Sequence, residues 1–182
     1  MRTFVVPTDF SINARYASEY TIQLAAQLDA NMVLMHCYEA PAAVSEYELG
    51  TLHFDTMKEH IRKRLEERKK ELQQTFGRKV SIECIASGQG LLEHIQKICA
   101  VKEAHLVVIG LTGVGMGNIF LGSNTLNIVN NVGRAVITVP PRAQFRHIKK
   151  VVFACDMKEV RNTVPAEKIE YATDRQIREI NN

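Results

Sequence analysis

The apolar residues of this chain follow two alternating patterns. Short runs rich in Val, Ile, Leu and Met are bounded by glycine, proline or polar residues, as strands buried on both faces are. Longer segments between them place an apolar residue every three or four positions, which is the spacing of one helix face. The pattern predicts strands at 2–6, 31–38, 79–86, 106–109 and 135–139, and helices at 11–28, 55–76, 91–101 and 123–132.

This alternation of strands and helices predicts an α/β fold with an open parallel five-stranded sheet. Parallel neighbours need a crossover helix between them, and right-handed crossovers in both directions place helices on both faces of the sheet. Residues 39–54 have no clear period and are predicted to form a loop over the sheet, a candidate lid. The basic residues at 62–70 are interleaved with glutamates, so we predict a solvated helix face there.

The end of the chain repeats the layout of its beginning. Pro140 and Pro141 follow the last predicted strand and indicate a linker. Beyond them, residues 150–156 (KVVFACD) have the same layout as residues 3–9 (TFVVPTD), as a tandem duplication would produce. The sequence therefore predicts a complete domain at 1–142, and a linker with the first strand and helix of an incomplete second copy at 143–182.

A glycine-dense segment connects the fourth predicted strand to the fourth predicted helix. Glycines let backbone N–H groups approach a ligand, and a helix N-terminus favours an anion, so this segment is a candidate phosphate site. Ser123 or Asn124 is placed to cap the helix. A turn that needs glycine only for its own path is the open alternative. The glycines are Gly110, Gly113, Gly115, Gly117 and Gly122.

Three separated motifs resemble the universal stress protein family. The pattern Gly110-x-x-Gly113, eight residues, then Gly122-Ser123-x-Thr125 is similar to the family's nucleotide-binding signature, whose spacer has nine residues. The segments VVPTDFS at 5–11 and LMHC at 34–37 resemble the family's first strand and turn and the end of its second strand. The resemblance implies the adenine nucleotide α-hydrolase-like fold with strand order 3-2-1-4-5, and it implies a homodimer formed along the fifth strand.

The resemblance also implies that ATP is the ligand. Pro7, Thr8 and Asp9 would border the adenine and ribose, and Cys37 would offer its backbone groups to the adenine edge. Gly110 and Gly113 would pass under the ribose and phosphates. The remaining implied contacts, to the phosphates at the helix N-terminus, are Gly122, Ser123, Asn124 and Thr125.

Each of these residues also has a purely structural interpretation. Asp9 could serve only as a turn residue, Ser123 only as a helix cap, and His36 as a core histidine. Residues 111–132 contain no Lys or Arg, so a triphosphate would depend on backbone donors, the helix dipole and Mg²⁺.

Composition excludes several other function classes. The 23 basic and 20 acidic residues give a net charge of +3, too balanced to indicate nucleic-acid binding. No apolar run is long enough to span a membrane and the start is unlike a signal peptide, so a cytoplasmic protein is expected. The four cysteines and six histidines show no metal-ligand spacing, and no metal site is predicted.

Three functions remain as hypotheses. The first is an ATP-binding stress-response module whose nucleotide occupancy alters its association with partners. The second is a dimerising interaction module of the same fold that has lost nucleotide binding, which the shorter spacer favours. The third is an enzyme, either a weak ATPase or a relative of the adenine nucleotide α-hydrolases, whose fold is similar. Those enzymes carry an SGGxDS-like loop after the first strand, whereas this chain has PTDFSIN, and no catalytic residue is predicted.

Overall fold

The computed structural model describes residues 2–38, 49–111, 114–115, 118–119 and 122–149. The chain divides into two units, Met1–Phe145 and Arg146–Asn182, and every helix and strand that is described lies in the first. The incomplete second copy predicted at 143–182 lies almost entirely outside the described residues and stays a prediction. The elements are β1 (Arg2–Pro7), α1 (Ile12–Leu28), β2 (Ala30–Cys37), α2 (Leu49–Phe76), β3 (Ile82–Ser87), α3 (Leu91–Val101), β4 (Leu106–Gly110), β5 (Val114–Gly115), β6 (Asn118–Ile119), α4 (Ser123–Asn131) and β7 (Ala135–Val139).

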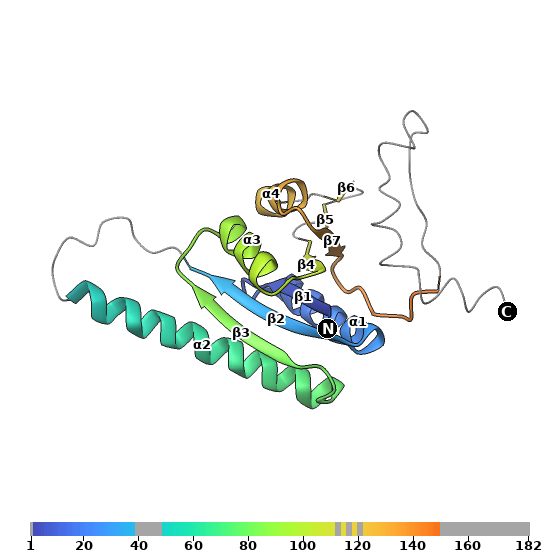
Figure 1. The fold of residues 1–182 in the computed structure, drawn as a ribbon, viewed down its shortest axis with the longest axis horizontal. Helices are drawn as coiled ribbons and strands as arrows, with labels where there is room; N and C mark the ends of the chain where they lie inside the picture. The colour runs from blue at the N-terminus through green and yellow to red at the C-terminus, as the bar shows by residue number, and fades with distance from the viewer. Residues whose placement is uncertain (1, 39–48, 112–113, 116–117, 120–121, 150–182) are drawn as a thin grey trace. The chain divides into compact units, whose positions relative to one another are not determined.

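One parallel sheet forms the centre of the first unit (Figure 1). Its strand order is β3-β2-β1-β4-β7, so the fold class and the predicted order 3-2-1-4-5 are confirmed. The strands pair in parallel throughout, with Val5 opposite Val33 on one side of β1 and opposite Val107 on the other. The connections after β1 and β4 therefore leave in opposite directions, and the carboxyl ends of these two strands flank an opening suited to a ligand.

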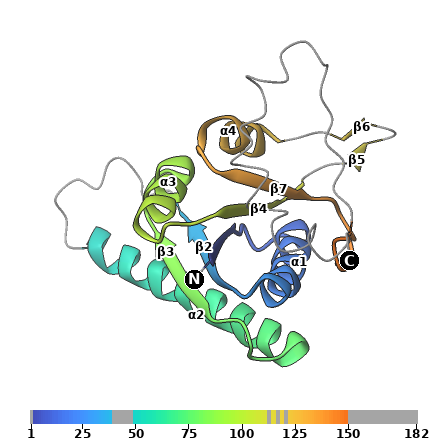
Figure 2. The same cartoon turned by 45° about the vertical axis from the view of Figure 1, so that its right-hand side comes forward.

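The helices cover the two faces of the sheet in pairs. Helices α1 and α2 lie on one face, and α3 and α4 on the other (Figure 2). Side chains alternate along each strand, so Val5 and Val107 enter the core under α3 and α4, where Ile95 and Ile128 are also buried. Each face thus has its own apolar layer, which is why the strands are apolar at nearly every position.

Most predicted boundaries lie within one residue of the structure, and three features differ by more. Helix α2 begins at Leu49, so the predicted loop at 39–54 is wrong over its last residues, and 39–48 lie outside the described part. Strand β3 begins at Ile82, three residues later than predicted. The glycine segment contains a two-residue antiparallel ladder, β5 with β6, where only a loop was predicted. Apolar periodicity alone does not fix the first residue of a helix or strand.

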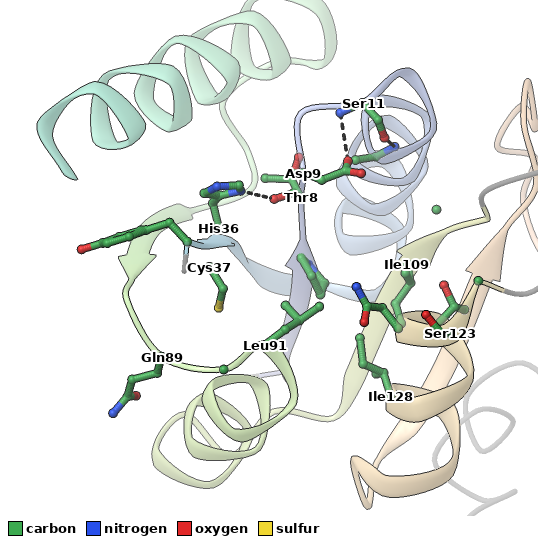
Figure 3. A pocket seen from close by; sticks show the side chains of 18 residues that line it. Thr8, Asp9, Ser11, His36, Cys37, Gln89, Leu91, Ile109, Ser123 and Ile128 are labelled. Carbon is green, nitrogen blue, oxygen red and sulfur yellow. Dashed lines mark hydrogen bonds between the residues drawn. The ribbon is translucent and has the colours of Figure 1, made fainter. Parts of the chain in front are cut away.

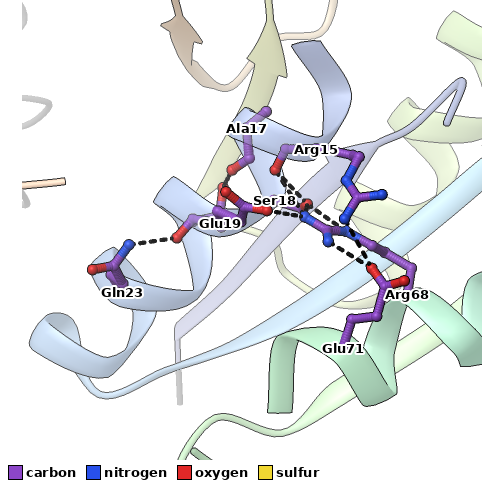
Figure 4. A network of polar contacts seen from close by, with 8 residues as sticks. Arg15, Ala17, Ser18, Glu19, Gln23, Arg68 and Glu71 are labelled. Carbon is purple, nitrogen blue, oxygen red and sulfur yellow. Dashed lines mark hydrogen bonds and ion pairs between the residues drawn. The ribbon is translucent and has the colours of Figure 1, made fainter. Parts of the chain in front are cut away.

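A polar network joins α1 to α2 at the position of Arg68 (Figure 4). The Arg68 guanidinium is buried and donates to the Ser18 hydroxyl at 2.8 Å and to the Arg15 carbonyl at 3.0 Å. It also pairs with Glu19 and Glu71, each at 2.9 Å. The prediction of a solvated face for the whole 62–70 segment is therefore wrong at Arg68, which fixes α2 against α1.

Candidate functional site

A cavity of about 510 Å³ opens at the carboxyl ends of β1, β2 and β4 (Figure 3). The structure brings nine of the ten residues suggested by the sequence into its lining, and the tenth, Gly113, lies outside the described residues. Three segments that are far apart in the sequence therefore meet at one place. The nine residues are Pro7, Thr8, Asp9, Cys37, Gly110, Gly122, Ser123, Asn124 and Thr125.

The turn after β1 forms the first wall, and its polar groups are bonded to one another. The Thr8 N–H donates to the Met35 carbonyl at 2.8 Å, which ties the turn to β2. The Ser11 N–H donates to Asp9 Oδ1 at 2.9 Å, and Ser11 Oγ accepts from the Ala14 N–H at the start of α1. Asp9 is thus a turn residue and a cavity residue at once, and its side chain is exposed to the opening.

The end of β2 supplies the next part of the lining. His36 Nδ1 lies 2.6 Å from the Thr8 carbonyl oxygen; since that oxygen can only accept, Nδ1 carries the proton. Cys37 follows on the other side of the strand and is half-buried; burial raises the pKa of its thiol to about 11. Cys37 is therefore a neutral thiol at physiological pH, and in Figure 3 it lies on the same side of the cavity as Leu91 of α3.

The N-terminus of α4 forms the second wall, and none of the described side chains is a cap for it. Gly122 is the N-cap residue and makes no side-chain hydrogen bond, so the prediction that Ser123 or Asn124 caps the helix is wrong. Both residues lie inside the first turn and are exposed, while Thr125 is buried. The first N–H groups of a helix have no intrahelical partner, so this wall presents donors and a partial positive charge to the cavity.

Gly110 lies where the first turn of α1 packs closely against the end of β4. A Cβ at this position would lie 2.4 Å from the Asn13 carbonyl oxygen and 2.6 Å from its carbon, because the first turn of α1 crosses the end of β4 there. The neighbouring atoms are backbone and cannot move aside. The fold therefore requires glycine at 110 whether or not a ligand passes over it.

Charge is sparse around the cavity. Among the described lining residues there is no Lys or Arg, and Asp9 is the one carboxylate. Among the same described residues, no group of three or more His, Cys, Asp or Glu side chains could hold a metal ion. None of the described helices is both long and apolar enough to cross a lipid bilayer.

Several lining residues were not predicted from the sequence. Gln89, Gly90 and Leu91 come from the connection between β3 and α3, and Tyr38 follows β2. The parallel sheet could have indicated them, because the carboxyl ends of neighbouring parallel strands meet at one edge. The motif search missed them because they carry no spacing signature.

Comparison with protein-family models gives one match. The model described as the universal stress protein family matches residues 1–140. This range covers both walls of the cavity and ends one residue after β7. The comparison with curated proteins gives no match.

Solved structures show the same fold. Universal stress protein UspA from Lactobacillus plantarum superposes with a TM-score of 0.63 at 20% identity, covering 76% of this chain and 97% of that one. A universal stress protein in complex with cAMP gives 0.56 at 22% identity, covering 77% and 97%. The Archaeoglobus fulgidus protein in complex with dAMP gives 0.51 at 14% identity, covering 76% and 97%.

Proposed function

Because the chain belongs to the universal stress protein family, we propose that its cavity binds an adenine nucleotide and that nucleotide occupancy regulates its association with partners in a stress response. One observation carries the proposal: the three sequence-distant segments that resemble the family contribute residues to the lining of a single cavity. Its volume of about 510 Å³ lies within the range of small-molecule sites, which is about 300–1,000 Å³. The relatives solved with cAMP and dAMP share this fold, which supports the choice of an adenine nucleotide.

The proposed pose follows the polarity of the two walls. The adenine lies beside Pro7 and the backbone of Cys37, and the ribose hydroxyls donate to the Asp9 carboxylate. The phosphates lie at the N-terminus of α4, where Ser123, Asn124 and Thr125 supply N–H and side-chain donors. Gly110 and Gly113 pass beneath the ribose and phosphates, and Gly122 leaves room for them.

We propose ATP as the nucleotide, with Mg²⁺ neutralising part of the triphosphate. The described lining holds no basic side chain, and residues 111–132 contain none in sequence. Each helix-terminus interaction contributes only about 0.3–1 kcal/mol at an exposed site, so several must act together. The affinity for ATP is therefore expected to be modest and to rise when Mg²⁺ is present.

Calorimetric titration of ATP, with and without Mg²⁺, tests the proposal. Wild type is expected to show saturable binding. Cys37→Phe places a ring in the cavity and should abolish binding, while the matched control Cys37→Ser keeps the side-chain size and should bind as wild type does. Absence of saturable binding to wild type, or equal binding by Cys37→Phe, would contradict the proposal.

A second candidate function is a homodimeric interaction module. Leu126 and Val129 on α4 are 43% and 40% exposed, and β7 ends the described sheet with one side unpaired within it. An apolar face beside an open sheet edge favours pairing with a second copy. Sedimentation equilibrium of wild type and of Leu126→Asp tests this candidate; a monomeric wild type would exclude it.

A tandem arrangement is the last part of the proposal. The likeness of residues 150–156 to residues 3–9 supports an incomplete second copy at 143–182, following the family domain at 1–142. Because the first unit, Met1–Phe145, contains every described helix and strand, removing residues 146–182 should leave its unfolding midpoint unchanged.

A further inference from the structure

Phe10 has a backbone conformation that is unfavourable for its residue type. Its φ angle is +62°, in the left-handed region that glycine, Asn and Asp adopt most readily. An aromatic residue in this region is strained, and such strain persists only where the surroundings enforce it. Phe10 sits in the turn between β1 and α1, directly after the proposed ribose contact Asp9.

Contacts from two other elements hold the Phe10 ring. The His36 ring of β2 lies 4.7 Å away between centroids, tilted by 39°. The Arg64 guanidinium of α2 lies 3.9 Å from the ring centroid, within the distance of a cation–π interaction. These two contacts stabilise the Phe10 ring in its position and so offset the strain of its backbone. A change in the Phe10 φ angle would move the ring away from His36 and Arg64.

The same residues also hydrogen-bond to Thr8 of the cavity wall, one to its side chain and one to its backbone. The Phe10 N–H donates to Thr8 Oγ1 at 3.0 Å, and His36 Nδ1 donates to the Thr8 carbonyl at 2.6 Å. Thr8 lines the large cavity and also a smaller one, of about 130 Å³, which Phe10 and Arg64 line as well. The ring thus lies behind the turn that presents Thr8 and Asp9 to the large cavity.

We propose that Phe10 is a positioning residue for the nucleotide site. Clamped by His36 and Arg64, its strained backbone fixes the direction of the Asp9 carboxylate before the ligand arrives. The inference rests on the proposed function and adds a link from α2 to the ribose side of the site. Preorganisation of this kind raises affinity by removing the cost of ordering the turn on binding.

Substitutions at Phe10 distinguish the contribution of the aromatic ring from that of an apolar side chain in general. Phe10→Tyr keeps the ring and should bind ATP within about twofold of wild type. Phe10→Leu keeps an apolar side chain without the ring and should weaken ATP binding about tenfold, equivalent to about 1.4 kcal/mol. Arg64→Ala should weaken it by about threefold, as loss of an exposed cation–π contact predicts. The control is Arg62→Ala, on the same helix but paired with Glu59, which should leave ATP binding unchanged.

A double-mutant cycle distinguishes positioning from general stability. If Phe10 acts through Asp9, Phe10→Leu should weaken ATP binding by less than about twofold in an Asp9→Ala background, because there is no carboxylate left to orient. A purely structural role predicts the same weakening in both backgrounds and would overturn the inference. Should Phe10→Leu not fold, the same cycle is run with Arg64→Ala.

The remaining outcomes assign failure to one proposal or the other. A wild type that binds ATP, with Phe10→Leu binding equally well, overturns the positioning role alone. A wild type that does not bind ATP overturns the proposed function and this inference with it.

Discussion

The two walls of the cavity use their polar groups in opposite ways. In the turn after β1, Thr8, Asp9 and Ser11 all bond within the protein, and the aromatic contacts of Phe10 add to the constraint. At the N-terminus of α4, Gly122 provides no side-chain cap, and Ser123 and Asn124 are exposed. One wall is fixed by the protein, whereas the other retains donors for a ligand.

In the proposed function, this difference gives the glycine-rich segment and the acidic turn separate roles at one site. The acceptor Asp9 needs a defined direction, which hydrogen bonds supply. The first N–H groups of α4 have no intrahelical partner, and the N-cap residue Gly122 makes no side-chain hydrogen bond to them. A ligand with hydroxyls at one end and an anion at the other matches both walls, as a nucleotide does.

The largest expected effect comes from Gly110, where α1 packs against the end of β4. Gly110→Ala forces a Cβ to within 2.4 Å of the Asn13 carbonyl oxygen, so α1 must shift from β4. We expect a loss of about 3 kcal/mol or more in the free energy of unfolding, measured by urea denaturation. Gly90→Ser is the control, because a Cβ there meets nothing within 4 Å and serine is a good N-cap for α3; its stability should be unchanged or slightly higher. Equal stability of both variants would contradict the close approach.

The next largest effect is expected from a substitution in the turn after β1, the wall whose polar groups bond within the protein. Asp9→Ala removes the carboxylate and the bond to the Ser11 N–H, and ATP binding measured by calorimetry should weaken by about tenfold to a hundredfold. Asp9→Asn keeps an oxygen for that bond but loses the charge, so its unfolding midpoint should equal that of wild type while ATP binding weakens less. Unchanged ATP affinity in Asp9→Ala would leave Asp9 with its turn role alone.

A substitution at the N-terminus of α4 should change the free energy of unfolding and the affinity for ATP in opposite directions. Ser123→Asp places a negative charge at the N-terminus of α4 and should stabilise the free protein by about 0.3–1 kcal/mol. The same charge repels a phosphate, so ATP binding should weaken, whereas the neutral Ser123→Asn should change both quantities little. Stability and ATP affinity rising together would show that the phosphates lie elsewhere.

The smallest effect is expected for the thiol of Cys37, which lines the cavity at the end of β2. Because burial raises the pKa of Cys37 to about 11, almost none of it is thiolate at pH 7.5. Alkylation of Cys37 by iodoacetamide, followed by peptide mass spectrometry, should be slow at pH 7.5 and should accelerate as the pH rises towards 11. Bound ATP should slow it further. Fast alkylation at neutral pH would contradict the burial of the thiol.

The sequence predicts the sheet and most of the predicted cavity residues better than it predicts single backbone angles and single inter-helix contacts. Strand order followed from the resemblance and the alternation of elements from apolar spacing, because both reflect burial of long segments. The N-cap at Gly122, the burial of Arg68 and the left-handed Phe10 were missed. Each of these three features depends on a single backbone angle or a single inter-helix contact. Such local features leave no periodic pattern in the sequence. In the sequence, Phe10 cannot be distinguished from other apolar residues; its φ angle of +62° is what identifies it.

Amide chemical shifts of the ¹⁵N-labelled protein during an ATP titration test the central claim most directly. The account predicts that Thr8–Ser11, Cys37 and Gly122–Thr125 shift together and saturate at one ATP concentration, since both walls contact one ligand. Shifts confined to one wall, or to residues outside the cavity, would contradict it.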